Sequence, residues 1–347
     1  MATVSKSIHI PLAFGKPTLA ANEVIVLAGD VGGTKTNLAL YAFTGETFRV
    51  LEHVHYHSAD FNGLTDVLQH FLQQYQKPAV ISLGVAGPVI HEKATITNLS
   101  WQIDNRDIKT ATGVQQVFLI NDLEALAYGL AAITNDNIYE LRAAKKQVAG
   151  NMAVIAPGTG LGEAGLYWDG KQYHPFATEG GHGDFAPRTE MDIELYRYLQ
   201  QQLGHVSWER LISGQGIVNI YRFLRDVKKM EVPAELSAAM QKEEDAAIIS
   251  KHAASGTCAI CDETMQLFFS YLAVECSNLA LKFKATGGVY IGGGIVPQVM
   301  NLLKTDVFNN TFLDAGRMRP LLENVPVHIL LDDKTALTGA AYYGAYF

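Results

Sequence analysis

Cysteine is scarce in this chain, with three residues among 347. So few cysteines, in an odd number, exclude a disulfide framework and favour a reducing compartment, so we expect a cytoplasmic protein. Cys258 and Cys261 form a CxxC, but no second cysteine pair or paired histidines follow at zinc spacing. We therefore interpret the CxxC as a buried helix start and assign no residue as a direct metal ligand.

Long apolar runs and excess positive charge are also missing. No run reaches the roughly 18 residues that a membrane span needs. Residues 1–23 lack the charged start, apolar core and cleavage pattern of a secretory signal, so we expect a loosely packed extension. Lys and Arg total 27 against 35 Asp and Glu, a net charge of -8. This balance argues against a nucleic acid or an anionic membrane as a partner.

A P-loop is absent too, because no glycine turn leads into Lys and Ser or Thr at the required spacing. Instead, residues 24–41 and 152–168 share one plan: an apolar run, a glycine-rich turn and a second apolar run. This repetition, together with the chain length, predicts two related α/β domains. The expected parts are an extension at 1–23, a small domain at 24–132 plus 334–347, and a large domain at 133–333.

Glycine turns of this kind can bind phosphate, because the backbone approaches an anion closely and successive N–H groups form a nest. One turn alone could equally be a plain hairpin, but two can clamp a polyphosphate. A third glycine cluster, Gly292–Gly294, follows a buried strand and suits a nucleotide base or ribose. Asp30 could hold Mg²⁺ through water. The candidate nucleotide-binding residues are Asp30, Gly32, Gly33, Thr34, Lys35, Gly158, Thr159, Gly160, Gly293 and Gly294.

Polar side chains at the end of an apolar strand form the next candidate. Asn121 and Asp122 follow the strand expected at 117–120, where α/β proteins place ligand-contacting groups. Together they can bind vicinal hydroxyls and accept a proton from one of them. The alternative is that Asp122 caps the helix that follows.

Two further polar groups lie in the second half. Glu179 and His182 flank two glycines, which leave both side chains open to hydrogen-bond a sugar. Glu209 adds another carboxylate. A structural loop and a capped helix start are the alternatives for these two segments.

Taken in order along the chain, these motifs resemble the bacterial-type glucokinases of the actin-like ATPase and hexokinase superfamily. The resemblance extends from about residue 24 to the C-terminus. It rests on residues 29–34, 97–101, 120–122, 158–162, 179–187, 204–210 and 291–297.

The resemblance implies an α/β fold of two actin-like (RNase H-like) domains with a cleft between them. It also implies ATP with Mg²⁺ as donor, Asp122 as the catalytic base and a homodimer. Lys35 and Thr36 depart from the family pattern, which could alter nucleotide preference. The implied glucose-binding residues are Asn98, Asn121, Asp122, Glu179, His182 and Glu209.

We therefore predict a glucokinase that moves the γ-phosphoryl of ATP to the 6-hydroxyl of glucose. A kinase for fructose, mannose or an N-acetylhexosamine is the first alternative. A non-catalytic sugar-sensing regulator is less compatible, because residues 1–23 are too short for a DNA-reading domain. A plain ATPase would have no use for Glu179, His182 and Glu209.

Overall fold

The computed structural model describes residues 10–15, 22–45, 47–96, 99–241 and 245–347. The chain divides into two compact units. Unit 1 comprises residues 1–137, 166–177 and 332–347, and unit 2 comprises 138–165 and 178–331. The domain limits predicted from the sequence placed residues 166–177 in the large domain, whereas this division groups them with unit 1. The predicted limits remain a prediction.

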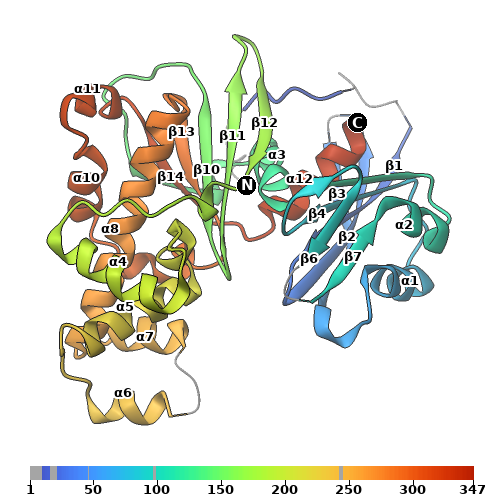
Figure 1. Cartoon of the computed structure of the whole chain (residues 1–347). Helices are drawn as coiled ribbons and strands as arrows, with labels where there is room; N and C mark the ends of the chain where they lie inside the picture. Colours follow the sequence, from blue (N-terminus) through green and yellow to red (C-terminus); the bar gives the residue numbers. More distant parts are fainter. Residues whose placement is uncertain (1–9, 16–21, 46, 97–98, 242–244) are drawn as a thin grey trace, which may run out of the picture. The chain divides into compact units, whose positions relative to one another are not determined.

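Unit 1 is built on a five-stranded sheet of order β3-β2-β1-β4-β8 (Figure 1). Strands β1, β2 and β3 form an antiparallel meander, whereas β1, β4 and β8 run parallel. The parallel strands therefore end at one edge of the sheet, where ligand-binding groups collect in α/β folds. The strands are β1 (Val24–Val31), β2 (Lys35–Thr44), β3 (Thr47–His57), β4 (Val80–Val85) and β8 (Gln116–Asn121).

Helices cover both faces of this sheet. On the fully buried strand β4, Ile81 and Leu83 belong to the core that includes α1, whereas Val80 and Ser82 lie against Gly344 of α12. This alternation is what a strand between two apolar layers requires. The helices are α1 (Leu64–Gln74), α2 (Asn105–Thr112), α3 (Asp122–Gly129) and α12 (Thr335–Tyr346), and a small sheet adds β5 (Val89–Ile90), β6 (Lys93–Ile96) and β7 (Trp101–Asp104).

The described part of the N-terminal extension is firmly packed, so the expectation of a loose extension was wrong for residues 10–15. Ile10 and Leu12 are buried, and Leu12 forms a parallel bridge with Tyr173. The Tyr173 N–H donates to the Pro11 carbonyl at 2.8 Å. The ring of Phe14 stacks on three tyrosines, namely Tyr128, Tyr342 and Tyr346, at centroid distances of 6.1, 5.9 and 4.6 Å.

Unit 2 is organised around a six-stranded sheet of order β12-β11-β10-β13-β14-β9. Its central strands β10, β13 and β14 are parallel, and β9 is antiparallel at the edge. The far end of the β11–β12 hairpin is the segment grouped with unit 1. The strands are β9 (Ile138–Arg142), β10 (Met152–Pro157), β11 (Leu161–Trp168), β12 (Tyr173–Thr178), β13 (Gly288–Ile291) and β14 (Val327–Leu330).

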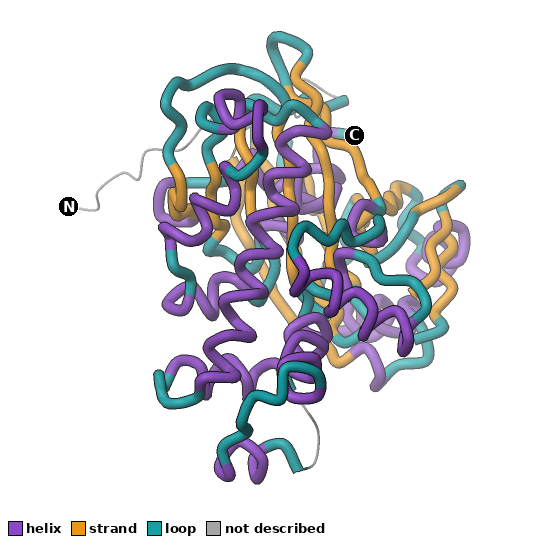
Figure 2. The backbone as a smooth tube through the Cα atoms, turned by 60° about the vertical axis from the view of Figure 1, so that its left-hand side comes forward, coloured by secondary structure: helices purple, strands orange, loops and turns teal. Residues whose placement is uncertain are grey.

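The 24-residue helix α8 (Ala259–Lys282) forms the centre of the helical layer in unit 2 and runs alongside the strands (Figure 2). It packs on β10 and β13 and against α5, α7 and α10. Cys258 directly precedes it and Cys261 lies in its first turn, both buried, which confirms the CxxC as a helix start. The other helices are α4 (Glu190–Leu203), α5 (Gly214–Asp226), α6 (Ala234–Ala239), α7 (Ala246–Ala254), α9 (Val296–Val299), α10 (Thr305–Leu313) and α11 (Arg319–Leu322).

Among the residues that the structure describes, no helix has the length and apolar character needed to cross a lipid bilayer.

Candidate active site

The glycine turn of unit 1 joins β1 to β2 and is held by a buried serine. The Gly32 N–H donates to the Lys35 carbonyl at 2.9 Å, which closes the turn. The Ser58 hydroxyl donates to the Gly32 carbonyl at 2.9 Å and lies 3.0 Å from the Thr36 hydroxyl. The Ser58 N–H also donates to the Thr34 carbonyl at 3.1 Å. Ser58 stands 22 residues from its partner Thr36, so no local sequence signal identified it.

Asp30 lies beside this turn, near the end of β1. Its carboxylate accepts a hydrogen bond from the Asn37 amide at 3.1 Å, and the Asn37 side-chain oxygen lies 2.6 Å from Nδ1 of His55. Burial raises the pKa of Asp30, the Asn37 hydrogen bond opposes this, and the nearby charge of Asp333 raises it further. A divalent cation would favour the ionised carboxylate here, so this acidic position beside a phosphate-type turn fits Mg²⁺.

Asn121, at the end of β8, caps the helix α3. Its side-chain oxygen accepts from the N–H groups of Leu123 and Glu124, at 2.9 and 3.3 Å, and its amide donates to the Gly87 carbonyl at 3.1 Å. The alternative that Asp122 supplies the cap was therefore wrong, since the N-cap of α3 is Asn121. Asp122 is the first residue of α3, and its carboxylate also accepts from the Leu123 N–H at 2.9 Å.

The sheet register brings the turn and the Asn121–Asp122 pair to the same edge of unit 1. Val31, Val85 and Asn121 occupy one row across β1, β4 and β8. Neighbouring strands lie about 4.8 Å apart, so the turn after Val31 and Asn121 are separated by roughly two strand spacings. Gly84, one row inward, permits the close approach of α3, because a Cβ there would lie 2.9 Å from the Cβ of Ala125.

The second glycine turn, in unit 2, joins β10 to β11. The Gly158 N–H donates to the Gly160 carbonyl at 2.8 Å, and the Gly214 N–H donates to the Gly158 carbonyl at 3.0 Å. Oε2 of Glu209 accepts from the Leu161 N–H at 3.0 Å. A Cβ at Gly160 would lie 2.5 Å from that same oxygen, so glycine is needed for the carboxylate to reach the turn.

Three of the expected sugar-binding side chains gather in unit 2. Nε2 of His182 lies 3.9 Å from Oε2 of Glu179, and Nδ1 of His182 lies 4.0 Å from Oε1 of Glu209. The side chains of Glu179 and His182 are 50% and 62% exposed, whereas that of Glu209 is 21% exposed. The cluster therefore offers open hydrogen-bonding groups, and Glu209 connects it to the glycine turn.

The third glycine cluster, at residues 292–294, lies against the second glycine turn, at residues 158–160. Ile155 of β10 pairs with Ile291 of β13, so both strands deliver their following glycines to one edge. Gly293 has a φ of 79°, and a Cβ there would lie 2.3 Å from the Pro157 carbonyl oxygen. Only glycine fits this position, and the helix α9 begins three residues later, at Val296.

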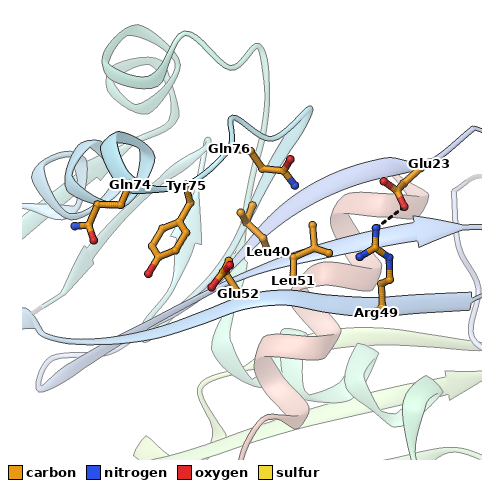
Figure 3. Close-up of a pocket in the computed structure, with 8 residues that line it drawn as sticks. All are labelled: Glu23, Leu40, Arg49, Leu51, Glu52, Gln74, Tyr75 and Gln76. Atoms are coloured by element: carbon orange, nitrogen blue, oxygen red, sulfur yellow. Dashed lines mark hydrogen bonds and ion pairs between the residues drawn. The ribbon is translucent and has the colours of Figure 1, made fainter.

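Asn98 lies outside the described residues. A cavity of about 490 Å³ in unit 1, lined by the ion pair of Glu23 and Arg49 and by Tyr75 among others, contains none of the candidate residues (Figure 3). Because no candidate residue lines it, we assign this cavity no part in the chemistry.

Comparisons with known proteins agree with the arrangement of these motifs. The glucokinase family profile matches residues 27–346. A glucokinase from Trichormus variabilis is 39% identical over 339 residues, covering 92% of this chain and 99% of that protein. The crystal structure of a glucokinase from an Antarctic psychrotroph has a TM-score of 0.77 at 32% identity, over 91% of this chain and 97% of that one. The glucokinase of Balamuthia mandrillaris, crystallised with glucose, has a TM-score of 0.79 at 21% identity over 94% of each chain, which supports the fold alone.

The fold and the three glycine clusters define a sugar kinase of the actin-like type. More particularly, the chain belongs to the glucokinase family. The expected α/β class, the two-domain actin-like fold and the ATP-dependent glucokinase activity are thereby confirmed.

Proposed function

We propose that this glucokinase uses Asp122 to accept the proton of the glucose 6-hydroxyl while that oxygen attacks the γ-phosphorus of ATP. A new O–P bond forms, the bond between the γ-phosphorus and the bridging oxygen breaks, and ADP leaves with the bonding electrons. The observation that carries the proposal is the position of Asp122 at the carboxyl end of β8, on the sheet edge that also holds the turn of residues 32–34. A base for this reaction has to lie within about 2.6–3.2 Å of the hydroxyl in the reactive complex.

Binding of the sugar is assigned to side chains from both units. Asn121 and Asp122 supply contacts from unit 1, and we include Asn98 from the family resemblance. The Asn121 amide carries two hydrogens, one of which is directed to Gly87, so the group can also donate to a hydroxyl. Glu179, His182 and Glu209 supply contacts from unit 2. Carboxylates accept from sugar hydroxyls and histidine can donate or accept, which allows dense recognition of a polyol.

Binding of ATP is assigned to the backbone of the glycine turns. Residues 32–34 and 158–160 would hold the phosphates through N–H groups, with the hydroxyls of Thr34 and Thr159 as added donors. Lys35 would add positive charge, and Gly293 and Gly294 would border the nucleoside. Mg²⁺, held through water by Asp30, would neutralise phosphate charge when bound. This set of donors and charges suits phosphoryl transfer, which requires mainly positioning and charge stabilisation from the protein.

The surroundings of the enzyme are proposed on less specific grounds. A cytoplasmic location agrees with the three reduced cysteines, all buried in the structure. A homodimer and independence from nucleic acids and membranes are proposed from the family resemblance and the charge balance. A coupled assay over glucose, fructose, mannose and N-acetylglucosamine, with ATP and GTP as donors, tests substrate choice. Equal rates with all sugars would contradict a glucose-specific site.

The decisive test of the base is Asp122→Asn. General-base catalysis contributes roughly 10²–10⁴-fold, so we expect kcat to fall by at least about 100-fold while glucose still binds. The matched control is Asp104→Asn, because Asp104 is also an aspartate at a strand-to-helix junction but caps α2 through the Arg106 N–H. Wild-type kcat in Asp122→Asn, or an equal loss in the control, would rule out Asp122 as the base.

A further inference from the structure

A carboxyl group that the proposed mechanism does not use is buried in unit 2. Glu163, in strand β11, is 1% exposed. Its Oε1 is inaccessible to solvent and has no hydrogen-bond partner among the described residues. A buried carboxylate without partners is costly, because neither water nor protein donors compensate its charge. Its presence therefore requires an explanation.

The side chain of Glu163 lies directly against the turn that carries Glu179 and His182. A Cβ at Gly180 would lie 2.0 Å from Oε2 of Glu163, so the carboxyl occupies the space that a side chain at 180 would fill. The Thr178 hydroxyl donates to the Glu163 carbonyl at 2.9 Å and accepts from the Gly180 N–H at 3.2 Å. Both the main chain and the side chain of Glu163 thus support the start of the turn.

The groups around Glu163 disfavour its negative charge. On α8, the buried carboxylate of Glu275 accepts from the Asn278 amide at 2.7 Å and from the Lys282 ammonium at 3.0 Å. Those two donors serve Glu275 rather than Glu163. Burial first, and then the charge of Glu275, raise the pKa of Glu163 to about 8, with Lys282 opposing.

The neighbouring thiol of Cys276 also fails to stabilise a negative charge on Glu163. Cys276, also on α8, is fully buried, and burial together with the charges of Glu275 and Glu163 raises its pKa. Since a cysteine is neutral as a thiol and negative as a thiolate, Cys276 does not compensate a negative charge on Glu163 in either form. Towards the turn, the titratable groups beyond Gly180 are Glu179 and His182, with Glu209 next to His182. The proton at neutral pH accordingly resides on Glu163.

We propose that Glu163, as an uncharged carboxyl, is a positioning residue for the turn Glu179–His182 and thereby sets the affinity for glucose. This inference rests on the proposed role of Glu179 and His182 in binding the sugar. Ionisation of Glu163 would place a negative charge against Gly180, the residue that follows Glu179 in the chain. The turn would then shift or admit water, and the geometry of the sugar contacts would be lost, whereas Asp122 and the first glycine turn belong to unit 1 and make no described contact with Glu163.

The experiment measures KM for glucose and kcat between pH 6 and 9.5 for wild type, Glu163→Gln and Glu275→Gln. If only the uncharged form binds glucose well, the wild-type KM rises by about tenfold per pH unit above the Glu163 pKa, with little change in kcat. Glu163→Gln cannot ionise and is expected to lack this rise. Glu275→Gln removes the repelling charge, so its rise is expected to begin at lower pH. The comparison between variants is the readout, because all three proteins keep the same sugar-binding side chains.

A second measurement is independent of activity. The raised pKa of Glu163 means that wild type loses stability as the pH rises from about 4.5, the ordinary value, to about 8. Glu163→Gln avoids this loss, so its melting temperature is expected to exceed that of wild type at pH 8 and to approach it at pH 5. If Glu163→Gln showed the same rise in KM as wild type, or were less stable than wild type at pH 8, the proposal would be overturned.

Failure of the underlying sugar assignment would look different. His182→Ala is expected to raise KM for glucose at every pH. If it binds glucose as wild type does, the proposed role of the turn fails. If it binds poorly while Glu163→Gln tracks wild type, only the inference about Glu163 fails.

Discussion

The two glycine turns have similar sequences but different supports. In unit 1 the turn is held by the neutral hydroxyl of Ser58, which is buried and bonded to Gly32. In unit 2 the corresponding turn is held by the carboxylate of Glu209 and by the Gly214 N–H. Ser58 contacts no candidate sugar-binding residue in any described interaction, whereas Glu209 lies 4.0 Å from His182.

This difference indicates unequal duties for two similar pieces of backbone. If the first turn holds phosphate as proposed, it can shift without disturbing the cluster of Glu179, His182 and Glu209. The second cannot, because one carboxylate serves both the turn and the cluster. We therefore expect substitutions at the first turn to affect ATP alone, and substitutions at the second to affect ATP and glucose together.

Among the substitutions that compare the two turns, Glu209→Ala is expected to have the largest effect on the kinetics. Hydrogen bonds to charged groups contribute about 1.5–3 kcal/mol, so loss of the sugar contact alone should lower kcat/KM for glucose by roughly 10- to 100-fold. The Leu161 N–H would also lose its acceptor, so KM for ATP should rise too. Steady-state kinetics with each substrate varied measures both changes.

The matched control is Glu179→Ala, which removes a carboxylate of the same cluster that makes no described contact with the turn. It is expected to weaken glucose binding and leave KM for ATP unchanged. An unchanged KM for ATP in Glu209→Ala would show that the two duties of Glu209 are separable.

An intermediate effect is expected from Gly160→Ala. The new methyl group would lie 2.5 Å from Oε2 of Glu209, so the carboxylate has to move. KM for glucose is then expected to rise by about tenfold, the loss of one modest hydrogen bond, although residue 160 is not itself a candidate sugar ligand. Gly32→Ala is the counterpart in unit 1, where the nearest atom to the new Cβ is the Lys35 carbonyl oxygen at 3.3 Å. It should change KM for ATP only, and a glucose effect of equal size there would contradict the distinction.

The smallest effect is expected from Ser58→Ala. The Gly32 carbonyl and the Thr36 hydroxyl would each lose a buried partner, at a cost of about 1–3 kcal/mol in the free energy of unfolding. Because the turn keeps its internal Gly32–Lys35 bond, KM for ATP should rise only about two- to fivefold, within the energy of one such hydrogen bond. Urea unfolding and ATP-varied kinetics test this, and a larger change in KM for glucose than for ATP would be inconsistent with it.

Much of the architecture was readable from local patterns. The strand expected at 117–120 lies within β8, and the glycine hairpins lie between β1 and β2 and between β10 and β11. Apolar runs bounded by glycine turns specify such elements through short-range effects, namely strand burial and turn geometry. The CxxC was expected at a helix start, and α8 begins at Ala259, between its two cysteines.

What escaped prediction depends on contacts between residues far apart in the sequence. Ser58 supports a turn that precedes it by more than 20 residues, and Glu163 supports a turn that comes after the end of the next strand, β12. Asn121 and Asp122 were recognised as a pair, but their division of labour was not. Only the local backbone geometry decides which of two adjacent side chains reaches the free N–H groups of a helix start.

The packing of Phe14 has a practical consequence for handling the protein. A version shortened to begin at Val24, where the family resemblance starts, would uncover the ring faces of Tyr128, Tyr342 and Tyr346 and leave the Tyr173 N–H without its Pro11 acceptor. Aromatic contacts contribute about 0.5–1.5 kcal/mol each beyond simple burial. Truncation at that point would therefore expose aromatic side chains that Phe14 covers in the full chain. Purification tags and cleavage sites consequently belong ahead of residue 10 rather than after it.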